Sequence, residues 1–113
     1  MSKLYKAKTE EWLLVDGNMG KVGLTEYAAK ELGDLVFIEL PSVGTNVTCG
    51  IPFCTVESVK AVSETYSPCC GVITAVNDEL DANPGKINED PLGTWIVEIE
   101  VEKISDELEL VKG

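Results

Sequence analysis

Two short runs of β-branched and aromatic residues, with one lysine between them, constrain the fold of this chain more than any other feature. Residues 51–56 and 71–76 are rich in Val, Ile, Phe and Thr and are bounded by Pro and Gly. Such runs predict paired β-strands. Lys60 then lies in the turn formed by residues 57–63, with its side chain in water. From the pattern alone, an ordinary solubilising surface lysine is the simpler interpretation.

A β-hairpin is predicted nearer the N-terminus. Residues 12–15 are apolar, residues 16–20 have the Asp-Gly and Asn chemistry of a tight turn, and residues 21–24 return as the partner strand. Residues 1–8 are polar and lysine-rich, and we expect them to form a loosely held arm.

One helix has clear start and stop signals. Thr25 is a good N-cap, and Gly33 follows as a C-terminal stop. The positions expected to line its apolar side recur at roughly helical spacing: Leu24, Tyr27, Ala28 and Leu32.

The rest of the chain contains more short elements. The predicted segments are a strand at 35–40, a loop or short strand at 43–50, a helical turn within 77–85, a loop at 86–93, a half-buried strand from 95 to 101 and a C-terminal helix at about 105–111. Short strands at turn-rich intervals predict a β-sandwich or barrel. At 113 residues, the chain is expected to form a single domain over residues 1–113.

The charge and residue content exclude several kinds of function. The formal net charge is −11 and every basic residue is a lysine, so nucleic acid is an unsuitable partner. Such acidity suits either partners with basic surfaces or simple solubility. The absence of histidine removes the commonest general base and zinc ligand, and we expect neither a catalytic residue nor a metal site.

Four cysteines indicate the compartment. Cys49, Cys54, Cys69 and Cys70 contain no C-x-x-C pair, and the vicinal pair is poorly placed to bond to itself. We interpret them as reduced packing residues, which implies a reducing compartment. No signal peptide or membrane-spanning stretch is recognisable, and a bacterial cytoplasmic protein is expected, or a mitochondrial matrix protein only if a transit peptide has been removed.

The segment around Lys60 resembles the lipoyl-attachment segment of the glycine cleavage system H-protein family. The resemblance extends from about residue 9 to residue 101, in the family's order and spacing. It is carried by residues 57–63, 23–28, 32–41, 66–68 with Gly71, 88–91 and 93–95. It implies a flattened barrel of two sheets, the lipoyl-domain or barrel-sandwich hybrid fold, with short added helices and a lipoyl hairpin at about residues 53–76.

The resemblance also implies a carrier function. Lipoate would be attached through an amide to Lys60, while Glu57 and Gly44 match positions that lipoate-attaching enzymes recognise. Each of the latter also has a simple structural explanation, as a solvated strand end and as a turn glycine with positive φ. Biotin carriers share the fold but usually have methionines beside the lysine, whereas Lys60 lies between Val59 and Ala61.

The partners implied by the resemblance are those of glycine cleavage. The lipoyl arm would receive an aminomethyl group as the pyridoxal-phosphate-dependent glycine decarboxylase acts on glycine. It would pass the one-carbon unit to tetrahydrofolate on the aminomethyltransferase, and dihydrolipoyl dehydrogenase would reoxidise it. The chain itself would be a non-catalytic shuttle.

One departure from the family leaves alternatives open. The family commonly has a histidine two residues before the first tryptophan, where this chain has Glu10. The alternatives are an H-like relay or regulatory lipoyl carrier for another pathway, and a non-lipoylated interaction domain in which Lys60 is only a surface residue.

Overall fold

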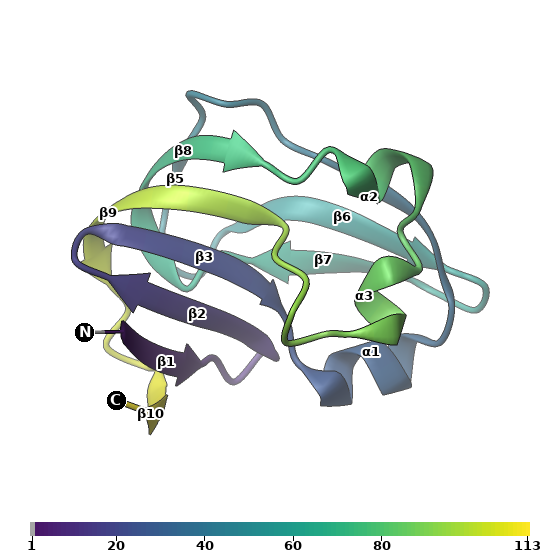
Figure 1. The fold of residues 1–113 in the computed structure, drawn as a ribbon, viewed down its shortest axis with the longest axis horizontal. Helices are drawn as coiled ribbons and strands as arrows, with labels where there is room; N and C mark the ends of the chain where they lie inside the picture. The colour runs from purple at the N-terminus through teal and green to yellow at the C-terminus, as the bar shows by residue number, and fades with distance from the viewer. Residues whose placement is uncertain (1) are drawn as a thin grey trace.

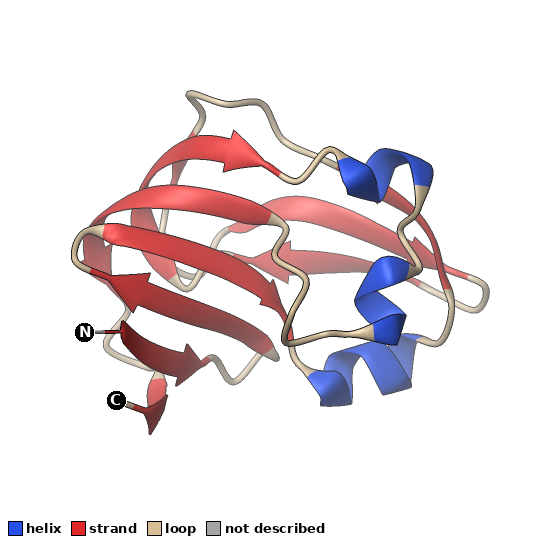
Figure 2. Cartoon of the chain, in the orientation of Figure 1, coloured by secondary structure: helices blue, strands red, loops and turns tan. Residues whose placement is uncertain are grey.

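The chain folds into two antiparallel β-sheets that share one hydrophobic core, with short helices gathered at one end (Figures 1 and 2). The computed structural model describes residues 2–113. The larger sheet has seven strands in the order β10-β1-β2-β3-β9-β8-β5, and the smaller has the order β4-β6-β7. The predicted two-sheet β architecture is therefore confirmed.

The strands of the larger sheet come from both halves of the chain. They are β1 (Ser2–Lys6), β2 (Glu11–Asp16), β3 (Met19–Leu24), β5 (Asn46–Val47), β8 (Cys69–Val76), β9 (Val97–Ile104) and β10 (Glu109–Lys112). The smaller sheet is built from β4 (Leu35–Glu39), β6 (Pro52–Ser58) and β7 (Val62–Tyr66). The helices are α1 (Glu26–Leu32), α2 (Glu79–Ala82) and α3 (Lys86–Glu89).

The predicted hairpin is formed by β2 and β3 and places Trp12 opposite Gly23. A Cβ atom at Gly23 would come within 2.4 Å of the Trp12 ring, so only glycine leaves room for the indole. The indole Nε1–H donates to the Pro91 carbonyl oxygen at 3.1 Å. The tryptophan therefore joins the larger sheet to the segment that follows α3.

Glu11 is a buried polar link between the two sheets. It lies in β2 with 1% of its surface exposed, and its carboxylate accepts a hydrogen bond from the Tyr66 N–H of β7 at 3.0 Å. The Thr9 hydroxyl also donates to it. Burial raises the pKa of the Glu11 carboxyl, and the hydrogen bonds from Thr9 and Tyr66 oppose that rise.

Helix α1 has the predicted caps and packs most of the predicted side against the core: Leu24 is buried, and Ala28 and Leu32 lie against the core. The Thr25 hydroxyl accepts from the Ala28 N–H at 3.1 Å, and Gly33 ends the helix at φ +77°. Ala29 is the buried residue, whereas Tyr27 is 61% exposed, so its predicted core position is wrong.

The two termini form strands where an arm and a helix were predicted. β1 pairs with β2 and with β10, so the interpretation of residues 1–8 as a loose arm is wrong for the residues from Ser2 onwards; Met1 lies outside the described range. The C-terminal helix at 105–111 is also wrong. Ser105 does accept a hydrogen bond from the Glu107 N–H at 3.2 Å, as an N-cap would. The same local bond closes a turn, after which the chain pairs with β1.

The predicted loop at residues 86–93 contains α3. Its Ile87 is fully buried in the common core. Burial of this one side chain explains the helical turn, since the segment has no strong helix signal of its own.

Thr65 of β7 provides a test of the core between the sheets. Its side chain is 1% exposed, and its hydroxyl has no hydrogen-bond partner within residues 2–113. We expect Thr65→Val to raise the free energy of unfolding by about 1 kcal/mol, because an unpaired buried hydroxyl is replaced by a methyl group. The matched control is Thr94→Val, since the buried Thr94 hydroxyl donates to the Lys86 carbonyl at 3.2 Å. That variant should lose stability by about the same amount in urea unfolding. A loss in both variants would contradict the expectation.

Candidate functional site

Lys60 lies at the tip of the β6–β7 hairpin, in a three-residue turn. The Ser58 N–H donates to the Ala61 carbonyl at 2.8 Å and closes the turn. The buried Ser58 hydroxyl accepts from the backbone N–H groups of Lys60 and Ala61, at 3.2 and 3.0 Å. One side chain thus satisfies the polar backbone on both sides of the lysine and gives the turn a defined shape.

The hairpin differs from the predicted pairing. β6 pairs with residues 62–66 of β7, whereas residues 71–76 belong to β8, which pairs with β9 and β5 in the other sheet. The predicted hairpin at 53–76 therefore spans two sheets. The chain crosses from the smaller sheet to the larger one at Ser67 and Pro68. Residues 62–66 were not predicted as a strand because the adjacent polar residues Ser63 and Glu64 interrupt the apolar pattern, as happens in a strand with one solvent-exposed face.

The turn is anchored from outside the hairpin. The Val59 N–H donates to the Asp34 carbonyl at 3.0 Å. The side chain of Asn88 in α3 binds the backbone on both sides of Asp34. The Asn88 side-chain amide N–H donates to the Gly33 carbonyl at 2.9 Å, and the Asn88 side-chain oxygen accepts from the Leu35 N–H, also at 2.9 Å. Three distant segments of the chain therefore meet beneath one turn.

Gly33 lies directly under the stem of the lysine side chain. A Cβ atom there would be 3.3 Å from Lys60 Cε and 3.9 Å from a methyl group of Val59. The residue also has φ +77°, which disfavours any side chain. Glycine at this position both ends α1 and leaves the path of the lysine stem open.

The surroundings of Lys60 are exposed and apolar. Val59 and Val62 flank it with 67% and 66% of their surface exposed, and Val36 and Phe37 of edge strand β4 are each 52% exposed. Within residues 2–113 no carboxylate forms an ion pair with Lys60. The amine is thus presented to solvent without a charged partner.

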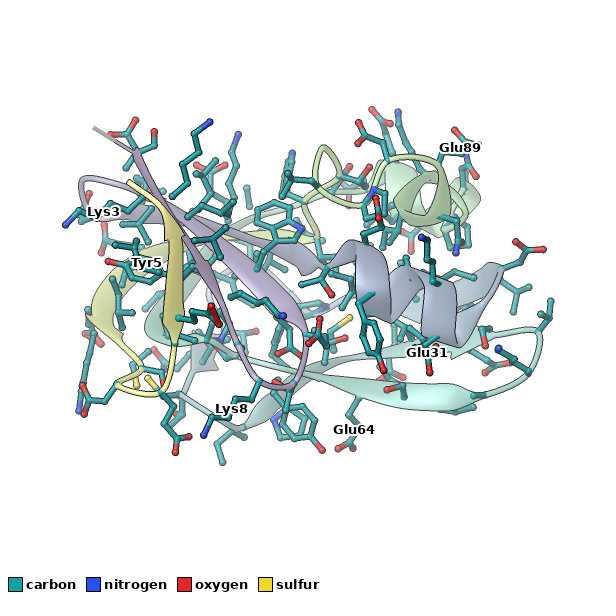
Figure 3. The ribbon with its side chains drawn as sticks, turned by 90° about the horizontal axis from the view of Figure 1, so that it is seen from below. Lys3, Tyr5, Lys8, Glu31, Glu64 and Glu89 are labelled. Atoms are coloured by element: carbon teal, nitrogen blue, oxygen red, sulfur yellow. The ribbon has the colours of Figure 1, made fainter. Side chains whose placement is uncertain are left out.

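The turn occupies the end of the molecule remote from both termini (Figure 1). Figure 3 shows Glu31 of α1 and Glu89 of α3 on the half that carries this end, and Lys3 of β1 at the other end. Both of these glutamates are exposed.

The two other predicted site residues, Glu57 and Gly44, lie in different parts of the structure. Glu57 is exposed in β6, opposite Val62 in the ladder and next to the turn. Gly44 lies in the connection between β4 and β5 at φ +94°, and its N–H donates to the Ile73 carbonyl of β8 at 2.8 Å. This bond attaches the connection at Gly44 to the larger sheet, whereas the lysine turn belongs to the hairpin of the smaller sheet.

Glu10, at the position where the resemblance leads one to expect a histidine, has a local structural role. Its carboxylate accepts from the Thr25 hydroxyl at 2.7 Å and pairs with the Lys6 amine at 3.4 Å. The Thr25 N–H also donates to the Glu10 carbonyl at 3.0 Å. This residue thus holds the N-cap of α1, and the departure does not touch the lysine turn.

Sequence reasoning missed the residues that position the turn. Asn88 and Asp34 appeared only inside segments that carried the family resemblance, with no role of their own, and Gly33 appeared only as the end of the predicted helix. Their hydrogen bonds span 53 and 55 positions in the chain for Asn88, so no local pattern could reveal them. The only sequence signal at these positions was Gly33 at the end of the predicted helix, and it did not indicate that the lysine turn lies beside it.

Three comparisons agree on the relatives of this chain. The family model described as "Glycine cleavage H-protein" matches residues 4–113. The probable glycine cleavage system H protein of Pyrococcus horikoshii is 52% identical over 107 residues, which are 93% of this chain and 79% of that protein. The glycine cleavage system H protein of Rubrobacter xylanophilus is 47% identical over 109 residues, or 96% and 84% of the two chains.

A solved structure has the same architecture. The crystal structure of a glycine cleavage system H protein from Mycobacterium marinum superposes with a TM-score of 0.87 at 32% sequence identity. The superposition covers 97% of this chain and 90% of that one. The fold implied by the resemblance is thereby confirmed. No helix among the described residues is long and apolar enough to cross a membrane.

We expect Asn88→Ala to loosen the turn as well as the fold. The variant leaves the Leu35 N–H and the Gly33 carbonyl without partners, which should cost about 2 kcal/mol of unfolding free energy. Hydrogen exchange at the Val59 amide should accelerate more than the global loss explains, because its acceptor lies between those two residues. Urea unfolding and exchange by NMR measure both. Asn83→Ala, at an exposed asparagine, should stay within about 0.5 kcal/mol. Equal effects of Asn88→Ala and Asn83→Ala on stability and exchange would contradict the role of Asn88 in anchoring the turn.

Proposed function

The chain belongs to the glycine cleavage H-protein family, and from that premise we propose that Lys60 is the residue on which it carries lipoate. The chain is a lipoyl carrier of the glycine cleavage system and a non-catalytic subunit of it. The observation that carries the proposal for Lys60 is its position at the tip of a hydrogen-bonded turn, with an exposed side chain that forms no ion pair within residues 2–113.

The site fits a covalently attached arm. Acylation of the Lys60 amine removes its charge, and no carboxylate of residues 2–113 depends on that charge for an ion pair. The stem passes over Gly33, where no side chain obstructs it. When bound, lipoate supplies the dithiolane chemistry of the carrier, and the protein supplies presentation and orientation.

The residues around Lys60 hold its backbone and leave its side chain free. Ser58 fixes the peptide groups of the turn, and the bond from Val59 to Asp34 fixes the turn on the body of the protein. A long arm on such a base can sweep a limited volume, so its end stays at high local concentration near a docked partner.

We propose that the lipoate-attaching enzyme reads Glu57 and Gly44 along with the lysine. Support for Glu57 comes from its exposed side chain three positions before Lys60, on the strand that leads into the turn. Support for Gly44 is its positive φ in a surface connection, with no atom within 4 Å of a Cβ placed there. Space alone does not require glycine at that position, although its backbone conformation favours it.

Membership in the family implies three further partners. These are the pyridoxal-phosphate-dependent glycine decarboxylase, the aminomethyltransferase and dihydrolipoyl dehydrogenase. A net charge of −11 favours partners with basic docking surfaces. The four free cysteines favour a reducing compartment, and the cytoplasm of a bacterial cell stays a prediction.

Coexpression with a lipoate-attaching enzyme should add one lipoyl group to the wild-type chain and none to Lys60→Arg. Arginine keeps the positive charge but has no amine that can form the amide. Intact mass and peptide mapping identify the modified residue. Lipoylated wild type should support glycine decarboxylation with the decarboxylase, and Lys60→Arg should not. A lipoyl group found on another lysine, or retained by the variant, would sink the assignment.

Reversing the charge at Glu57 separates recognition from folding. Glu57→Lys should slow lipoylation at least several-fold, because an exposed charge beside the turn faces the attaching enzyme. Its unfolding free energy should change by no more than about 0.5 kcal/mol. The matched control is Glu100→Lys, at an exposed glutamate of β9 in the other sheet, which should be lipoylated at the wild-type rate. An unchanged rate with a large loss of stability would make Glu57 structural.

A further inference from the structure

Two of the four cysteines meet at the edge of the larger sheet. Cys49 follows the short edge strand β5, and Cys70 is the second residue of β8. Their Sγ atoms are 3.0 Å apart, and the Cys49 N–H donates to Cys70 Sγ at 3.2 Å. Both residues are half-buried, so both thiols have access to solvent. Packing alone does not account for this pair.

The two thiols are chemically unequal. The Cys49 thiol and backbone N–H lower the pKa of Cys70, since both stabilise its thiolate, and Lys103 adds to the effect. Burial and the interaction with Cys70 raise the pKa of Cys49 to about 11. Cys70 is therefore the nucleophilic member of the pair, and Cys49 is a thiol held against it.

The other two cysteines lie outside this pair. Cys69 precedes Cys70 in the same strand, and the alternation of the strand turns its side chain into the core, where it is 0% exposed. Cys54 of β6 is 5% exposed. Burial raises the pKa of both thiols to about 12, which keeps them protonated and unreactive. These two fit the predicted role of reduced packing residues.

The pair lies at the base of the hairpin that carries Lys60. The chain between Cys49 and Cys70 contains β6, the lysine turn and β7. Backbone bonds already close this base: the Gly50 N–H donates to the Ser67 carbonyl at 2.8 Å, and the Ser67 N–H donates to the Ile51 carbonyl at 3.0 Å. A covalent link between the cysteines would close the same loop, and the two Sγ atoms, now 3.0 Å apart, would approach by about 1 Å to form it.

We propose that Cys49 and Cys70 are a redox-active thiol pair that forms a reversible disulfide at the base of the lysine hairpin, with a low-molecular-weight disulfide as its oxidant. The Cys70 thiolate attacks one sulfur of the small disulfide and releases one small thiolate. Cys49, after loss of its proton, then attacks Cys70 Sγ and releases the second. The two cysteines lose two electrons and two protons in all, and the small disulfide is reduced to two thiols.

The test uses the full chain and Lys60→Arg, so that no lipoyl dithiol can contribute. Each is incubated with oxidised glutathione and analysed by intact mass and peptide mapping under non-reducing conditions. We expect loss of two hydrogens, a peptide linked through Cys49 and Cys70, and no retained glutathione. Reduced glutathione in excess should reverse the link. The oxidised form should have a higher thermal midpoint, because the link restricts the unfolded chain.

Single variants distinguish the two thiols. Cys49→Ser should retain one glutathione on Cys70, because no second thiol is left to displace it. Cys70→Ser should remain unmodified over the same time, and Cys54→Ala should form the link as the wild type does. The proposal is overturned if the wild type keeps glutathione on Cys70, links a different pair or does not react. It is equally overturned if Cys70→Ser reacts as fast as Cys49→Ser.

Discussion

The turn that carries Lys60 projects beyond the hydrophobic core, so hydrogen bonds rather than burial hold it in place. The buried hydroxyl of Ser58 organises the turn from within, and Asn88 fixes the segment to which Val59 is bonded. Such bonds are individually modest, about 1 kcal/mol each, but they are directional. They can therefore define the orientation of a lysine without enclosing it, which burial could not do.

This arrangement separates two demands that a carrier makes on its chain. The body must be rigid, and two sheets around one core provide that through residues such as Leu13, Ile73 and Ile99, which have no exposed surface. The lysine proposed to carry lipoate must remain free, and Gly33 beneath its stem leaves its path open by having no side chain. The three helices gather at the end where these demands meet (Figure 2).

The proposed thiol pair extends the same logic to the base of the hairpin. Strand β5 has only two residues and lies at the edge of its sheet, so it pairs with β8 over a short length. A disulfide between Cys49 and Cys70 would reinforce that edge and close the loop that carries Lys60. The disulfide would stabilise the base of the hairpin that carries Lys60. It would leave the exposed Lys60 amine and the surface beside Glu57 unchanged.

The sequence by itself determined the local features of this protein. Strand-forming runs, the caps of α1 and the turn at Lys60 follow from interactions among residues a few positions apart. The family resemblance added the expected function, because it spans most of the chain in order. What the local signals could not decide was which strands pair. Residues 71–76 have the pattern of a strand whichever strand they pair with. They were predicted to pair with residues 51–56, but in the structure they pair with β9, and β7 is the partner of β6.

Tertiary structure alone decided the ends of the chain, the support of the turn and the meeting of the two cysteines. The bond at Ser105 suits either a helix start or a turn, and pairing with β1 selected the turn. Asn88 and the pair of Cys49 with Cys70 depend on contacts between segments far apart in the sequence. The physical reason is the same in each case: a local pattern fixes which backbone conformations are favourable, but the partner of an unpaired strand edge or polar group is chosen only when the whole chain closes around its core.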